Sequence, residues 1–217
     1  MMKSVLIIGA SGFVGAAVTN EALERGFEVK AMTRHPEKIE IENPLLTKVK
    51  GDVLAKRSLS AHMKGMKLVI SAYNPGWDNP NIFDDTIKGY ANIIECAKKT
   101  GVERLLIVGG AGSLFVSEGL RLVDSGAIPE PILPGVKAMA LILYDLQINE
   151  KDLDWVFFSP AGEISPGERT GKYRLGKDNL IVNAAGESKI SLEDYAREML
   201  NELLHPKRHQ TRFTIGY

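Results

Sequence analysis

The stretch Val5-Leu6-Ile7-Ile8-Gly9-Ala10-Ser11-Gly12-Phe13-Val14-Gly15 decides the fold of this chain. Its four leading apolar residues show no alternation, which predicts a short strand buried on both faces, as in a parallel sheet. A helical apolar pattern follows the glycines. Gly9 allows a tight turn, Gly12 leaves the backbone open to an anion, and Gly15 lets the helix pack closely on the strand. Because a helix N-terminus offers free N–H donors, the stretch predicts a pyrophosphate-binding site.

The glycine spacing narrows the class of this turn. It is Gly-x-x-Gly-x-x-Gly without a Gly-Lys-Ser/Thr sequence, which excludes a nucleotide-triphosphate P-loop. A tight strand-to-helix turn that binds nothing is the alternative. The segment resembles the turn of the extended and atypical short-chain dehydrogenase/reductase (SDR) superfamily. The resemblance implies a Rossmann domain that binds NAD(H) or NADP(H) through Gly9, Ala10, Ser11, Gly12, Phe13, Val14 and Gly15.

The composition limits the partners that the chain can attract. Its 217 residues include 27 Lys and Arg and 27 Asp and Glu, so no net charge draws it to nucleic acid or to a membrane surface. We therefore expect a small-molecule substrate and no nucleic-acid, membrane or metal partner, and we make no prediction of the oligomeric state. Neither a signal peptide nor a transmembrane span is indicated, which predicts a cytoplasmic protein.

The first half of the chain alternates predicted strands with helical patterns. The strands are Val5–Ile8, Val29–Met32, Thr47–Lys50, Leu68–Ser71 and Leu105–Val108, and the helices are Phe13–Arg25, Ser58–Met63 and Asp84–Lys99. This alternation predicts an α/β fold with a Rossmann-type, doubly wound parallel sheet. The length fits a single NAD(P)-binding domain over residues 1–217.

The second half is less regular and predicts a small, irregular C-terminal substrate region within residues 126–217. Ser191 is the expected N-cap of the last helix, with Asp194 at its N3 position. The predicted elements are a loop at 126–135, a helix at 136–150, a strand at 155–159, a hairpin pairing 173–175 with 180–182, a helix at 192–204 and a strand at 212–215.

The end of the second predicted strand bears on the choice of cofactor. NAD-binding Rossmann domains usually carry an acid there, which binds the ribose 2′-hydroxyl. This strand ends Ala31-Met32-Thr33-Arg34 and has no acid at that point. A guanidinium at Arg34 suits a 2′-phosphate, and Thr33 can donate a hydrogen bond to it. The pair favours NADP(H) over NAD(H), and the alternative is an ordinary surface arginine at the start of a loop.

Further cofactor contacts are implied by the resemblance to the SDR superfamily. After the third predicted strand, Asp52 and Val53 match the pair that contacts the adenine, although Asp52 could instead cap the segment before Leu54. After the fourth, the backbone of Ser71, Ala72 and Tyr73 matches the part that lies along the ribose and phosphates. Tyr73 and Trp77 then open a proline-containing loop that is either a lid or a connection.

The superfamily's reaction centre is where this sequence departs from the pattern. The fifth strand normally delivers a catalytic serine, and the turn Gly109-Gly110-Ala111-Gly112-Ser113 offers Ser113, or only an incidental serine in a glycine-rich turn. In the Tyr-x-x-x-Lys pair of the next helix, Lys137 fills the lysine place, which holds the cofactor ribose, and Leu133 fills the tyrosine place. Leucine cannot transfer a proton, and Tyr144 lies well inside the helix.

A hydride acceptor that needs no enzyme acid fits this altered centre. The whole chain resembles a compact atypical SDR group of NAD(P)H-flavin reductases. The resemblance implies an NADPH-dependent oxidoreductase that passes hydride to a flavin (FMN, FAD or riboflavin) or to another planar acceptor. Two alternatives stay open: an NAD-dependent nucleotide-sugar epimerase or dehydratase, and a non-enzymatic NADP(H)-sensing regulator of the NmrA-like kind.

Overall fold

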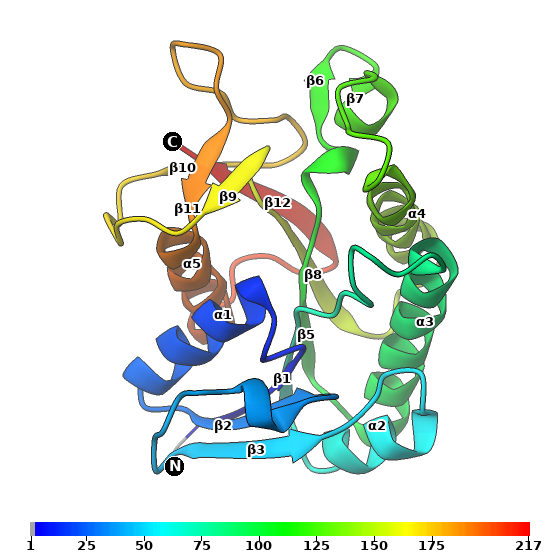
Figure 1. Cartoon of the computed structure of the whole chain (residues 1–217), viewed down its shortest axis with the longest axis vertical. Coiled ribbons are helices and arrows are strands. Elements are labelled where there is room, and N and C mark those ends of the chain that lie inside the picture. Colours follow the sequence, from blue (N-terminus) through cyan, green and yellow to red (C-terminus); the bar gives the residue numbers. More distant parts are fainter. Residues whose placement is uncertain (1–2) are drawn as a thin grey trace.

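The strand predicted at the start of the chain lies inside a large, mostly parallel sheet. The computed structural model describes residues 3–217, and over them this sheet has eight strands (Figure 1). In spatial order they are β10 (Arg174–Gly176), β12 (Thr211–Gly216), β8 (Asp154–Ser159), β5 (Arg104–Val108), β4 (Leu68–Ser71), β1 (Ser4–Ile8), β2 (Glu28–Thr33) and β3 (Leu46–Lys50). Only the pair β10–β12 is antiparallel. The predicted Rossmann-type sheet is confirmed.

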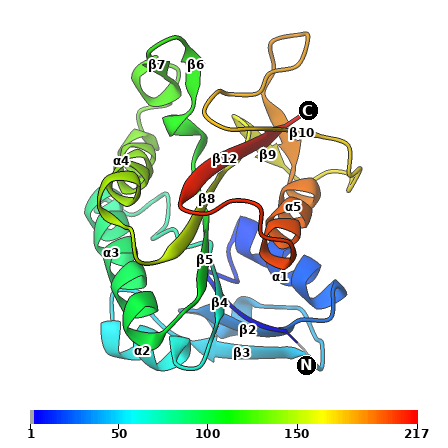
Figure 2. The same ribbon diagram turned by 180° about the vertical axis from the view of Figure 1, so that it is seen from behind.

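Helices cover both faces of the sheet, as Figures 1 and 2 show from opposite sides. One face carries α1 (Phe13–Glu24) and α5 (Leu192–Leu204), and the other carries α2 (Lys56–Met63), α3 (Ile82–Thr100) and α4 (Leu133–Asn149). Alternate residues of β1 pack into two cores, one on each face of the sheet. Val5 and Ile7 belong to the core beneath α1 and α5, Leu6 and Ile8 belong to the other, and all four are buried. No helix within residues 3–217 has both the length and the apolar character needed to cross a membrane.

Shorter elements surround the carboxyl end of the sheet. The antiparallel pair β6 (Phe115–Ser117) and β7 (Leu120–Arg121) stands beside α4, and the parallel pair β9 (Glu163–Ser165) and β11 (Lys189–Ser191) lies near β10 (Figure 1). The 3₁₀ helices are η1 (Pro36–Lys38), η2 (Ala111–Ser113) and η3 (Leu122–Asp124).

The predicted hairpin between 173–175 and 180–182 is wrong. Its first half is β10, whose partner is the last strand, with Arg174 opposite Gly216. Its second half bonds elsewhere: Phe115 donates to the Asp178 carbonyl, and Leu180 donates to the Phe115 carbonyl. Because these backbone groups are already paired, the segment after β10 cannot fold back onto it.

The helix ends also differ in detail from the predicted ones. α4 begins at Leu133, three residues earlier than predicted, with a proline in its first turn, a position that needs no N–H donor. The predicted N-cap of α5 is confirmed, since Ser191 Oγ accepts from the Asp194 amide at 3.0 Å. The Asp194 carboxylate does not complete a capping box. It accepts instead from Thr170, Gly171 and Tyr217.

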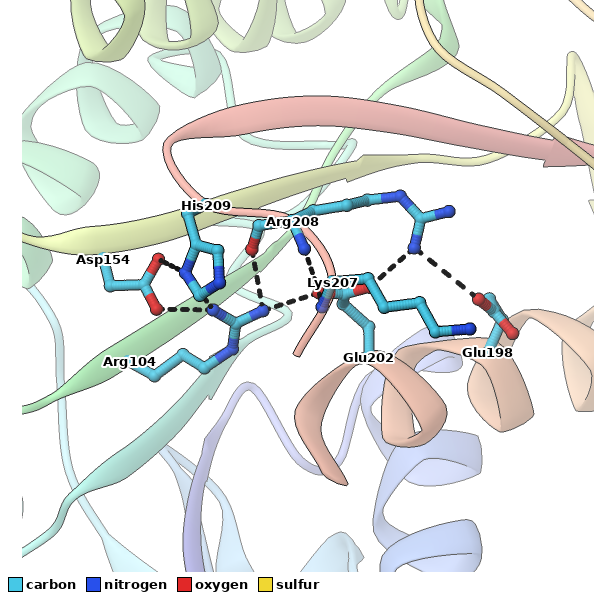
Figure 3. Close-up of polar contacts among 7 residues, drawn as sticks. All are labelled: Arg104, Asp154, Glu198, Glu202, Lys207, Arg208 and His209. Atoms are coloured by element: carbon cyan, nitrogen blue, oxygen red, sulfur yellow. Dashed lines mark hydrogen bonds and ion pairs between the residues drawn. The ribbon is translucent and has the colours of Figure 1, made fainter. Parts of the chain in front are cut away.

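A buried ion-pair network fixes the loop between α5 and β12 at the amino-terminal ends of β5 and β8 (Figure 3). Arg104 opens β5, and its side chain is only 5% exposed. It donates to Asp154 Oδ2 at 2.5 Å, to Glu202 Oε1 at 2.7 Å and to the Arg208 carbonyl at 3.0 Å. Glu202, which is 1% exposed, also pairs with the Arg208 guanidinium at 2.6 Å.

Candidate cofactor and acceptor site

A cavity of about 570 Å³ opens at the carboxyl ends of the parallel strands. The chain runs outward from β1 to β2 and β3 and then crosses back to β4, so β1 and β4 flank the topological switch point where α/β sheets bind ligands. One half of the cavity adjoins β1 and β2, where the glycine-rich turn lies. The other half adjoins β5, β8 and the first turns of α4. We call them the turn half and the α4 half.

The glycine-rich turn in the turn half has the backbone geometry that its spacing predicts. Gly9 has a φ of 79°, and a Cβ there would lie 2.5 Å from the Ala72 carbonyl oxygen. A Cβ on Gly15 would lie 2.1 Å from the Gly9 carbonyl oxygen, so α1 can pack here only with glycine. A Cβ on Gly12 would meet only the Gly9 oxygen, at 3.2 Å, and otherwise open space. Gly12 therefore borders the space that a ligand would fill.

The N-terminus of α1 is suited to an anion. Its first turn holds no acidic residue, and Gly12, its N-cap, supplies no side chain. The first N–H groups of a helix lack intrahelical partners and carry the positive end of its dipole. Ser11 Oγ and Thr33 Oγ1 lie 2.6 Å apart at the cavity wall, so a hydroxyl pair joins this turn to the end of β2. These groups fit the pyrophosphate and ribose of a nicotinamide dinucleotide.

Arg34 lies just after β2 and lines the same half of the cavity. Its side chain is exposed, and its Nη2 donates to the Pro75 carbonyl at 3.1 Å. No acidic residue is among the described residues that line the cavity. The neighbouring Glu37 carboxylate is engaged with His35 at 2.9 Å.

The structure separates the other predicted cofactor residues into two groups. Phe13, Val14, Val53, Ala72 and Tyr73 line the cavity. The remaining ones are not among the lining residues: Ala10, Gly15, Asp52 and Ser71. Asp52 Oδ1 accepts from the Leu54 amide at 2.9 Å, which is the capping contact that the sequence offered as the alternative.

The side of α4 that faces the cavity is apolar. Ile132, just before the helix, and Gly135, Val136 and Met139 line it. Lys137 is exposed and is not among the lining residues. Leu133 and Tyr144 do not line the cavity either, and Tyr144 is 61% exposed. The structure therefore does not bring Lys137 to the cavity wall, and its role at the cofactor ribose stays a prediction.

Ser113 is buried in a separate network behind the α4 half. Its Oγ accepts from Arg212 Nη1 at 3.1 Å, and Arg212 also donates twice to Asp178 Oδ1, at 3.0 and 2.6 Å. Gly112 lines the cavity, but Ser113 does not. The network ties η2 to β12 and to the segment after β10. Whether Ser113 orients a ligand stays a prediction.

The two tyrosines that line the cavity have their hydroxyl groups committed elsewhere. Tyr73 donates to the Asp85 carbonyl at 3.1 Å, and Tyr195 donates to the Phe158 carbonyl at 2.6 Å. Burial raises the pKa of both hydroxyls above the ordinary tyrosine value, and for Tyr73 the nearby Asp85 raises it further. Neither phenol is placed to give or take a proton at neutral pH.

Sequence reasoning gives several wall residues of the α4 half no role. It assigns Trp77 to a loop and gives it no further role. The other apolar wall residues belong to no recognisable motif: Leu122, Ile128, Ile132, Val136, Met139 and Ile164. Their shared signal is apolar character at the carboxyl edge of the sheet, in segments that are irregular or at the start of a helix. That signal becomes visible only when the fold brings these segments together.

The fold and this site define a Rossmann-type dinucleotide-binding protein. Residues 9–206 match the family model described as NAD(P)H-binding, so the chain belongs to this NAD(P)H-binding family. Over 213 residues it is 39% identical to the uncharacterized protein YwnB of Bacillus subtilis, with 96% of each chain covered. It is also 26% identical to a Synechocystis protein named "putative dihydroflavonol 4-reductase", of which it spans 66%.

Solved structures agree with this assignment. A Bacteroides thetaiotaomicron protein described as a "putative epimerase" is 57% identical, with a TM-score of 0.94 over 100% of this chain and 98% of that one. A Streptococcus pneumoniae protein described as a "putative NADH-flavin reductase" is 33% identical, with a TM-score of 0.83 over 100% and 99% of the two chains. These relatives place the chain among atypical SDR proteins of the epimerase and reductase kinds, and they support a general NAD(P)H-dependent oxidoreductase.

Proposed function

We propose that this protein is an NADPH-dependent reductase of a flavin-like, planar acceptor. The observation that carries the proposal is the α4 half of the cavity, where the described lining residues include no acid, no free phenol and no lysine. Reduction of a carbonyl group or epimerisation of a sugar needs a proton donor or acceptor at the reacting atom. An oxidised flavin needs only a hydride, with a proton from solvent completing its reduction.

The chain's own residues supply binding and orientation for this reaction. When bound, a reduced nicotinamide supplies the hydride, two electrons with one proton, and is left oxidised. The α1 N-terminus and the Ser11–Thr33 pair would hold the dinucleotide backbone, and Arg34 would hold a 2′-phosphate. The absence of an acid from the lining next to Arg34 supports NADPH over NADH. The apolar walls of the α4 half would exclude water once donor and acceptor fill it.

Steady-state turnover with purified protein tests this function. We expect NADPH to be consumed in the presence of FMN, FAD or riboflavin under anaerobic conditions, with a higher kcat/KM for NADPH than for NADH. The Gly12→Val variant is the negative control, because its side chain would enter the dinucleotide space. Tight NADPH binding without turnover of any flavin would contradict the reductase and favour the regulator. Interconversion of a nucleotide sugar would favour the epimerase, the activity for which the Bacteroides relative is named.

A further inference from the structure

Trp77 is the most exposed aromatic side chain in the α4 half of the cavity. It lines the cavity and is 52% exposed. The other tryptophan, Trp155, is buried in the core with 1% exposure. A large aromatic side chain gains by losing contact with water, and it stacks well on another planar ring. Trp77 is thus available to a ligand in a way that Trp155 is not.

The protein holds Trp77 in place from two directions. Gly76 has a φ of 121°, which favours glycine, and its amide donates to Asn74 Oδ1 at 2.7 Å. On the far side, a Cβ on Gly135 of α4 would lie 3.0 Å from Cζ3 of Trp77, so the missing side chain makes room for the indole. The loop ends are tied to α3, since Tyr73 Oη and Asn79 Nδ2 both bond to Asp85. Trp77 therefore forms a fixed part of the cavity wall and is not a mobile surface side chain.

The remaining walls of this half carry no positive charge. Arg34, in the turn half, is the one Lys or Arg among the described lining residues. The other walls of this half are apolar and include Ile132, Val136 and Met139. A phosphate on an acceptor would meet no arginine or lysine side chain here, although phosphate-binding sites normally place one at that group. At the N-terminus of α4, the Leu133 amide already donates to the Pro129 carbonyl and Pro134 has no N–H.

Resting on the proposed reductase function, we propose that Trp77 is the specificity-determining residue for the acceptor. It stacks on an uncharged tricyclic ring of the flavin type, and the site makes no use of a phosphate. Riboflavin and FMN share that ring and differ only in a phosphate group, so they should be equivalent ligands. Discrimination among acceptors then depends on ring size and planarity.

The test is a binding titration that involves no turnover. The protein is saturated with NADP⁺, which cannot deliver hydride, and riboflavin or FMN is titrated while the fluorescence of the ring is followed. We expect the two Kd values to agree within about threefold, because a phosphate contact would tighten FMN by about tenfold or more. Riboflavin bound beside Trp77 should also quench part of the protein's tryptophan fluorescence. This quenching should be absent in Trp77→Phe.

Variants separate stacking from folding. Trp77→Ala should weaken riboflavin binding about tenfold, since stacking on an aromatic side chain contributes on that scale. Trp77→Phe should retain most of the affinity. Tyr144→Ala is the matched control, because Tyr144 is 61% exposed, against 52% for Trp77, but lies outside the cavity lining. NADP⁺ binding, measured on each variant, shows that the fold is intact.

The outcomes distinguish this inference from the proposed function. FMN binding tighter than riboflavin by tenfold, or unchanged riboflavin binding in Trp77→Ala, would overturn the role of Trp77, whether or not NADPH reduces flavins. Absence of any riboflavin binding would overturn it too. Equal binding of riboflavin and FMN, lost in Trp77→Ala, would support it even if NADPH turnover failed and the reductase function fell.

Discussion

The Arg34 guanidinium donates through Nη2 to the carbonyl oxygen of Pro75, at 3.1 Å. This contact joins the end of β2 to the loop that carries Trp77, two residues further along. A guanidinium has five N–H donors, so Arg34 can keep this bond and still hold a second acceptor. One exposed side chain therefore connects the turn half of the cavity with the wall of the α4 half.

Replacing Arg34 tests its role in cofactor choice. Arg34→Ala should weaken NADPH binding by about 1.5–3 kcal/mol, the range of a lost charge-assisted hydrogen bond, and should affect NADH much less. Arg34→Lys should recover part of the loss, because it keeps the charge without the planar fork. Fluorescence titration of both cofactors measures these changes. Tighter binding of NADH than NADPH to the native protein would contradict the assignment.

Two glycines of the same turn should respond differently to a side chain. In Gly12→Val the new Cβ meets only one backbone oxygen, so the far-UV circular dichroism should survive while cofactor binding disappears. In Gly15→Val the Cβ would lie 2.1 Å from the Gly9 oxygen, so the thermal midpoint should fall as well. Retained cofactor affinity in Gly12→Val would place the site elsewhere.

The parts of the fold that sequence predicts are those with a local cause. The glycine turn, the buried strands and the Ser191 cap each depend on residues adjacent in the chain, and the structure has them where expected. The position of β10 depends on a strand about forty residues later, which no local pattern specifies. The hairpin prediction failed for that reason.

The sequence also does not predict which face of α4 meets the cavity, and the reason is physical. Apolar residues occur on its buried side and on its exposed side, where Leu141, Tyr144 and Ile148 are each about half exposed or more. A helix that is apolar nearly all round does not show which face meets the cavity. The residue that lines the cavity is Val136, and the predicted ribose-binding Lys137 is its neighbour in the chain, on a different side of the helix.

Variants of α4 test the absence of a general acid. Tyr144→Phe should leave flavin reduction by NADPH within about twofold of the native rate, because no phenolic proton is used. Lys137→Ala should also change the cofactor KM little, because the Lys137 side chain is exposed and does not line the cavity. A rise in that KM with kcat retained would support the ribose-binding role instead. A thousandfold loss of kcat in Tyr144→Phe would revive the carbonyl-reductase and epimerase alternatives.

The Arg104 network should contribute to stability and not to ligand binding. Arg104→Ala takes from the buried Glu202 carboxylate one of its two guanidinium partners and leaves Arg208 at 2.6 Å, so we expect a loss of about 1.5–3 kcal/mol, the range of hydrogen bonds to charged groups. The matched control is Arg121→Ala, whose pair with Asp124 is nearly half exposed and should contribute below about 1 kcal/mol. Denaturant unfolding measures both. Because Arg104 lies at the amino-terminal ends of the strands and the cavity at their carboxyl ends, cofactor Kd should stay constant. A loss below about 1 kcal/mol in Arg104→Ala would show that the network contributes little.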